Sequence, residues 1–345
     1  MEDNSEYPKW KLFFDLGKRN LEMKDNISAL NALRKSIEIK DTNHLPFLYK
    51  GMANNRLGKF QEAINDFTKS LEIKEDVNSY IERGRAFNSL GNYKSALIDL
   101  NFAHKLIRQN SKFKNSSELF HNRGITYYGL KKFRNSVIDL SKAIKLKADD
   151  FFVFNNRGWA YFRLKNWNKA NEDWIEAIKR NPENKYLLIC YEQLSLINIK
   201  LQNYKEVIKL SEKGYALSLE HHSNWKRNSL SKEEKEIINS NWLVYLGFAN
   251  IKLNDYEQAE YWLDKVNFLY MDRPNTRACE LLCMSFALIH LDKYEEALDY
   301  FDKALRVKKV FDWNFIFSEI EELLDELPDE MKSIIRIEFQ YKFSK

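Results

Sequence analysis

The sequence predicts an all-α protein, a right-handed α-solenoid of about eight helix-turn-helix repeats. Only 10 glycines and 5 prolines occur in 345 residues, while 44% of the residues are apolar and 30% charged. This composition favours long helices over a turn-rich β-sheet protein. Glycines also recur about every 34 residues inside helix-like apolar patterns. Fixed residue types follow each of them, and such self-similarity at a constant period is typical of repeat architectures.

A glycine in the predicted first helix marks most units. In a helix, glycine costs about 1 kcal/mol relative to alanine, so its recurrence at one position predicts a close approach of two helices. The markers are Gly17, Gly51, Gly84, Gly124, Gly158 and Gly247, with Ser195 and Ser285 in the sixth and eighth units. Gly58 and Gly91 lie seven residues after a marker and are predicted to end first helices in a left-handed conformation.

The second helix of each unit follows from positions counted from the marker. An aromatic residue comes nine positions later, a small one twelve, a large apolar one sixteen and a mostly small one nineteen positions later. Steps of four and three place these side chains on one face of a helix. Asn26 and Ser211 depart from the pattern, which predicts that the first and sixth units are looser or that their helices pair irregularly.

Residues 151–184, FFVFNNRGWAYFRLKNWNKANEDWIEAIKRNPEN, carry the pattern most completely, and Pro182 follows their second helix. Glycine, aromatic and alanine positions at a period near 34 resemble the tetratricopeptide repeat. The resemblance covers about residues 11–308, and it implies a helical solenoid that binds other proteins.

The predicted organisation is a tail (1–10), a repeat array (11–310) and two capping helices (311–345) broken at Pro328. The repeats are predicted to start near residues 11, 45, 78, 118, 152, 187, 238 and 277. Extra residues at 111–116 predict a polar loop or a helix extension. Ser231 and Glu234 form a capping-box pattern that predicts a long first helix from about residue 232 to 253. The capping helices cover the last apolar face or, alternatively, dock a partner.

The resemblance implies a concave groove lined by first helices. Its candidate residues are Tyr49, Arg85, His121, Asn122, Phe152, Asn155, Asn156, Trp159, Tyr245 and Phe248, and Met52, Glu82, Ile125 and Phe286 occupy the same registers. Asn122 and Asn156 stand at equivalent positions and either hydrogen-bond a peptide backbone or only solvate the groove. The groove aromatics are expected to be interface anchors, with burial in the core as the alternative. Chaperone-adaptor members of the family clamp a ligand carboxylate with lysines, where this chain has Leu48, Ile81 and His121. No carboxylate-clamp chaperone binding is therefore expected.

The predicted function is a non-catalytic scaffold or adaptor that binds a peptide segment or helix of another protein. No Gly-rich phosphate loop, HExxH or CxxC occurs, and Cys279 with Cys283 offers too few ligands for zinc. We therefore expect no catalytic residue, metal or cofactor. With no long apolar stretch, no apolar leader and three cysteines, we expect a cytoplasmic protein without a membrane span.

Two alternative functions stay open. Residues 1–150 carry 27 Lys and Arg against 19 Asp and Glu, within a net charge of +5. A basic, aromatic-rich superhelix can bind single-stranded nucleic acid, although the predicted groove has few cations, so nucleic acid is not the expected partner. A regulatory, non-catalytic subunit of an enzyme complex would have the same fold.

Overall fold

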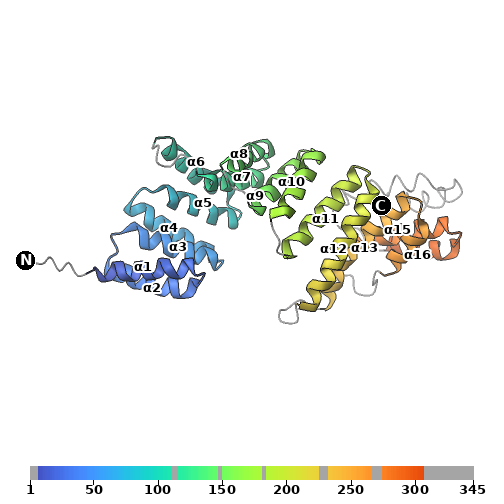
Figure 1. The fold of residues 1–345 in the computed structure, drawn as a ribbon, viewed down its shortest axis with the longest axis horizontal. Coiled ribbons are helices and arrows are strands. Elements are labelled where there is room, and N and C mark those ends of the chain that lie inside the picture. The colour runs from blue at the N-terminus through green and yellow to red at the C-terminus, as the bar shows by residue number, and fades with distance from the viewer. Residues whose placement is uncertain are drawn as a thin grey trace, which may run out of the picture. The chain divides into compact units, whose positions relative to one another are not determined.

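The computed structural model describes residues 7–109, 116–146, 150–180, 184–224, 232–265 and 274–306. Within these ranges the chain forms sixteen α-helices and no strand (Figure 1). The helices are α1 (Lys9–Glu22), α2 (Asn26–Ile39), α3 (His44–Arg56), α4 (Phe60–Ile73), α5 (Val77–Ser89), α6 (Tyr93–Gln109), α7 (Ser117–Gly129), α8 (Phe133–Lys145), α9 (Phe151–Arg163), α10 (Trp167–Arg180), α11 (Asn184–Lys200), α12 (Tyr204–Asn224), α13 (Lys232–Lys252), α14 (Tyr256–Asp264), α15 (Pro274–His290) and α16 (Tyr294–Arg306). The all-helical repeat fold predicted from the sequence is confirmed.

The chain divides into two compact units, residues 1–180 with α1–α10 and residues 181–345 with α11–α16. In the first compact unit each odd-numbered helix packs against the next one, so that α1 with α2 and α3 with α4 form hairpins. The second helix of a hairpin also packs on the first helix of the following one, as α4 does on α5. Successive first helices touch as well, so α1, α3, α5, α7 and α9 form one row.

The marker glycines let the two helices of a hairpin approach closely, as predicted. A Cβ atom on Gly51 would lie 2.6 Å from the Phe67 ring, and at all six glycine markers the obstructing side chain is sixteen residues later. In the sixth hairpin Ser195 replaces glycine, and its hydroxyl lies 3.1 Å from that of Ser211. Both serines are fully buried. The prediction that Ser211 loosens this hairpin is therefore wrong, because a serine marker needs a small partner.

All eight hairpins turn through a left-handed residue seven positions after the marker. Gly58 and Gly91 have φ of +75° and +73°, which confirms their predicted role. The other six hairpins place a larger residue there, namely Lys24, Lys131, Lys165, Gln202, Asn254 and Asp292. A side chain in this conformation costs roughly 1–2 kcal/mol, so these turns are held by the packing of the helices around them.

Two long helices occur where the sequence predicts extra length. The first helix of the seventh hairpin, α13, has 21 residues and closely matches the predicted range of 232–253, while Ser231 of the proposed capping box lies outside the described residues. The helix α6 has 17 residues and ends at Gln109, immediately before the expected loop or extension at 111–116. The predicted capping helices at 311–345 lie outside the described residues.

Buried ion pairs join the two helices in four consecutive hairpins. The residue directly before the marker is a cation, and an aspartate lies fifteen residues after the marker. The pairs are Lys50–Asp66, Arg83–Asp99, Arg123–Asp139 and Arg157–Asp173, with N–O distances of 2.5, 2.7, 2.6 and 2.6 Å. All four aspartates are buried, and a buried charge is tolerated only with a partner. The first hairpin has Leu16 and Ala32 at these two positions.

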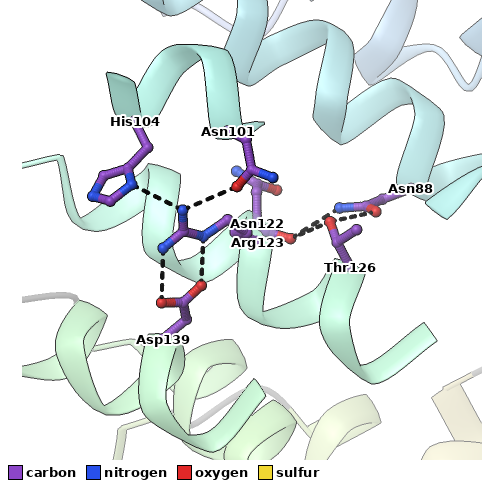
Figure 2. A network of polar contacts seen from close by, with 7 residues as sticks. All are labelled: Asn88, Asn101, His104, Asn122, Arg123, Thr126 and Asp139. Atoms are coloured by element: carbon purple, nitrogen blue, oxygen red, sulfur yellow. Dashed lines mark hydrogen bonds and ion pairs between the residues drawn. The ribbon is translucent and has the colours of Figure 1, made fainter. Parts of the chain in front are cut away.

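The arginine of such a pair also binds the preceding hairpin (Figure 2). Arg123 donates to Asp139 on α8 at 2.6 and 3.1 Å. Its remaining terminal nitrogen lies 3.2 Å from the amide oxygen of Asn101 and 3.1 Å from Nδ1 of His104, both on α6. An arginine only donates, so His104 accepts. In the same way Arg83 donates to Thr68 and Arg157 to Ser141. Each of these arginines therefore ties its own hairpin to the one before it.

Candidate binding groove on the first helices

The row of first helices in the first compact unit presents one face that carries most of the predicted groove residues. This groove face comprises the positions two before and one after each marker on α3, α5, α7 and α9, namely Tyr49, Met52, Glu82, Arg85, Asn122, Ile125, Asn156 and Trp159. Glu82 and Asn122 are buried and the other six are half-buried. The face is therefore partly accessible to a ligand.

A pocket of about 190 Å³ opens on this face between α7 and α9. Its lining consists of Ile125, Tyr128, Asn156 and Trp159. The indole of Trp159 is held edge-on by the rings of Trp174 and Phe162, with centroid distances of 5.5 and 5.7 Å. Mostly apolar walls with one amide are the usual composition of a pocket that takes an apolar group and orients it by a hydrogen bond.

The amide of Asn156 is oriented by His121 on the neighbouring helix. Its Nδ2 lies 3.1 Å from Nε2 of His121. Burial lowers the pKa of His121, so the ring is neutral near pH 7 and Nε2 can accept this hydrogen bond. Among the described residues no group donates to the other end of the amide, Oδ1 of Asn156. This oxygen can therefore accept a hydrogen bond from a ligand.

Three charged residues on α5 and at the start of α7 form a cluster, and two of them, Glu118 and Arg85, act electrostatically on His121. The guanidinium of Arg85 is 2.7 Å from the Glu82 carboxylate and 3.4 Å from that of Glu118. Only 5% of Glu82 is exposed, and burial raises the pKa of its carboxyl group to about 7. The groove face thus combines an apolar pocket with a partly buried charge cluster.

Asn122 does not present its amide on the groove face. It is buried, and its Nδ2 donates to the backbone oxygen of Glu118, one turn earlier on the same helix, at 3.0 Å. Its backbone oxygen accepts from the amide of Asn88 and the hydroxyl of Thr126 at 3.0 and 2.9 Å (Figure 2). The predicted pair of exposed asparagines is therefore wrong, and only Asn156 is available. The neighbouring Asn155 is half-buried, and its buried amide oxygen has no donor among the described residues.

Tyr245 and Phe248 in the second compact unit are core residues, so their prediction as groove anchors is wrong. They are 5% and 1% exposed, and Phe286 at an equivalent position is 3% exposed. Tyr245 donates a hydrogen bond to Glu192 on α11, and the ring of Phe248 lies 6.3 Å from that of Tyr204 on α12. The long helix α13 packs against α11, α12, α14 and α15, which enclose these side chains.

Of the other two aromatic residues predicted to line the groove, Phe152 is exposed and Tyr49 is half-buried. Phe152 is 45% exposed and meets Phe151 edge-on, with a centroid distance of 5.2 Å. Tyr49 is half-buried and packs edge-on against Phe14 of α1 at 5.3 Å, so it belongs mainly to the packing between hairpins. Tyr128 lines the pocket but was not among the predicted groove residues. It lies four residues after its marker, and Phe162 is an aromatic at the same position of the next unit.

Across the described residues, no three His, Cys, Asp or Glu side chains converge as a metal site would require. Among the helices described here, none combines the length and the apolar character needed to cross a bilayer. Cys283 is buried, whereas the side chain of Cys279 lies outside the described part of the chain.

Comparison with known proteins relates three segments to one family. Residues 50–77, 117–150 and 151–184 match models described as "Tetratricopeptide repeat". No curated protein matches the chain. Among solved structures, the C-terminal part of a TPR repeat-containing protein from Cytophaga hutchinsonii has 14% identity and a TM-score of 0.52, and 83% of this chain covers 98% of it. Pseudomonas aeruginosa pilF has 16% identity and a TM-score of 0.50, over 66% of this chain and 96% of that one. At these identities the two structures support the fold alone.

Proposed function

Since this chain is a tetratricopeptide repeat protein, we propose that it is a non-catalytic scaffold whose groove face binds a peptide segment or helix of another protein. The pocket between α7 and α9 is the observation that carries the proposal. It combines three features of a peptide-binding site, namely an apolar cavity, an aromatic wall and an unused hydrogen-bond acceptor.

The pocket suits an apolar side chain of the partner. Trp159 and Tyr128 form rigid walls, and large aromatics in well-packed pockets dominate the binding energy of protein interfaces. Next to the inserted side chain, the partner backbone would donate an N–H to Oδ1 of Asn156. This hydrogen bond gives affinity without reading the sequence of the partner.

The charge cluster of Glu82, Arg85 and Glu118 adds selectivity, since two of its members act electrostatically on His121, the partner of Asn156. Glu118 is largely exposed and Arg85 is about one-third exposed. Charges at the rim of an interface mainly affect the rate of association and the choice of partner. A partner with complementary charges beside its apolar anchor would bind preferentially.

The test uses peptides selected against the purified full chain from a random library displayed on phage, followed by dissociation constants for purified peptides. Trp159→Ala should weaken binding at least tenfold, and Asn156→Ala several-fold. Tyr261→Ala removes a half-exposed aromatic from α14 in the second compact unit and should leave the affinity unchanged.

Circular dichroism must show that the variants retain the helical content of the wild type. Asn156→Ala removes no apolar packing, so it tests the site even if Trp159→Ala perturbs the fold. Equal affinity of wild type, Trp159→Ala and Asn156→Ala for the selected peptides would refute the proposal.

A further inference from the structure

The outward face of α1 exposes apolar side chains at registers that other first helices bury fully or in large part. Leu12, five residues before its marker, is 57% exposed, and Leu16, one before it, is 46% exposed. At the register of Leu12 the other units carry Ser79, Leu119 and Val153, all 0% exposed, and Trp242, 3% exposed. At the register of Leu16, Leu246 is 0% and Met284 2% exposed. In α1 these two registers therefore lack their usual cover.

The structure shows what covers the register of Leu16 in the following hairpins. The arginines at this register donate to the second helix of the preceding hairpin, Arg83 to Thr68 on α4 and Arg157 to Ser141 on α8. The contacts between whole helices are consistent with these hydrogen bonds, since α4 packs on α5 and α8 packs on α9. In the later first helices of the row, the face that corresponds to Leu12 and Leu16 of α1 is therefore the face on which the preceding second helix packs.

The α1 face does not have the character of a polar cap. Leu12, Leu16 and Met23 follow at intervals of four and seven residues, which places them in one stripe, and Met23 is 69% exposed. The buried ion pair of the next hairpins is absent, because Leu16 and Ala32 occupy its positions. Solenoid ends that face water are normally polar, and contiguous exposed apolar residues mark interaction sites.

We propose that the stripe of Leu12, Leu16 and Met23 docks an amphipathic helix of a partner protein, seated as the second helix of a preceding hairpin. Lys9 and Arg19 are exposed, and they lie three residues before and seven residues after Leu12, on the side of the stripe. The partner helix therefore carries acidic residues beside its apolar face. In a symmetric pair of two α1 faces these cations would oppose each other, which disfavours a second copy as the occupant. This surface is distinct from the groove face.

The probe is a fluorescein-labelled synthetic peptide of residues 60–73, the sequence of α4. In the protein this helix packs on the equivalent face of α5, and it carries Glu62, Asp66 and Glu72 against Lys69. An isolated helix of this length is marginally stable, so the affinity is weak and the comparison between variants is decisive. Fluorescence anisotropy with the full chain should show saturable binding.

Leu12→Glu/Leu16→Glu should weaken binding at least tenfold, and Lys9→Glu/Arg19→Glu several-fold. Ile98→Glu/Ile138→Glu is the matched control, because these isoleucines on α6 and α8 are 58% and 65% exposed and lie elsewhere. It should bind like the wild type. All six original side chains are exposed, so the substitutions leave the core intact.

Absence of saturable binding, or equal binding by the wild type and Leu12→Glu/Leu16→Glu, would overturn the proposal. Sedimentation of the wild type as a dimer that Leu12→Glu/Leu16→Glu converts to a monomer would also overturn it, because a second copy would then occupy the face.

Discussion

Replacing Glu82 by glutamine should remove a pH-dependent destabilisation of the first compact unit. Glu82 is 5% exposed. Burial raises the pKa of its carboxyl group from about 4.5 to about 7, although Arg85 and Arg56 oppose the rise and Glu118 adds to it. In the unfolded chain the same group titrates near its ordinary value.

The direction of the effect follows from proton linkage. Between about pH 4.5 and 7 the folded protein holds a proton on Glu82 that the unfolded chain releases, so stability falls as the pH rises through this window. A difference of about 2.5 pH units corresponds to about 3 kcal/mol at 1.36 kcal/mol per unit. Glutamine has nearly the same shape and carries no charge. Glu82→Gln should therefore equal the wild type near pH 4 and exceed its free energy of unfolding by up to about 3 kcal/mol at pH 8.

Urea unfolding of both proteins, followed by circular dichroism between pH 4 and 8, measures this difference. His121 and the other titrating groups are present in both proteins, so their contributions largely cancel. Glu72→Gln on α4 is the control, because 55% of the Glu72 side chain is exposed and Glu72 is not among the charges that act on Glu82; its profile should follow the wild type. A Glu82→Gln protein that is less stable than the wild type at pH 8 would refute the argument.

Two further predictions concern the packing of the hairpins. Asp139→Ala leaves the nearly buried Arg123 without its carboxylate and should cost about 3–5 kcal/mol in urea unfolding. Arg123→Leu/Asp139→Ala, which copies Leu16 and Ala32, should recover most of this loss, and a cost below about 1 kcal/mol for the single change would contradict the role of the pair. Lys131 has φ of +58°, so Lys131→Gly should stabilise the protein by about 1 kcal/mol, whereas Gly58→Ala should destabilise it by a similar amount. Thermal unfolding midpoints that shift in the opposite directions would show that the turn strain is relieved elsewhere.

The hairpin architecture was predictable because the contact between helices restricts residue size at fixed intervals. Gly51 and Phe67 satisfy this restriction in one way, and Ser195 with Ser211 in another. The left-handed turns were only partly predictable. Glycine at position 58 is a readable signal, whereas Lys131 adopts the same conformation and looks like any surface lysine.

The binding groove was predictable only in part, because the position of a residue within its repeat does not determine whether neighbouring helices cover its side chain. Asn156 and Trp159 line a pocket, but Tyr245 and Phe248 at equivalent registers are enclosed by neighbouring long helices. Asn122 binds a backbone oxygen of its own helix, a competing partner that the sequence pattern does not reveal.

The four buried ion pairs stand in the sequence as cations and aspartates sixteen residues apart, but scattered charges on helices are usually solvated, so the pairing was not predicted. Their regular interval is the signal that separates them from ordinary surface charges. A search for opposite charges at one constant spacing in consecutive repeats would have found them.

The shared arginines have a consequence for how the molecule comes apart. When one hairpin between α4 and α9 opens, the arginine of a neighbouring hairpin loses a hydrogen-bond acceptor. The opening of one hairpin therefore destabilises the next. The linkage ends with Arg157, because Leu194 with Leu210 and Leu246 with Trp262 replace the charges in the next two hairpins. The helices α4–α9 therefore share one chain of polar contacts between hairpins, whereas the hairpins of the second compact unit are joined by a continuous apolar core that includes Ile199, Phe248 and Ala304.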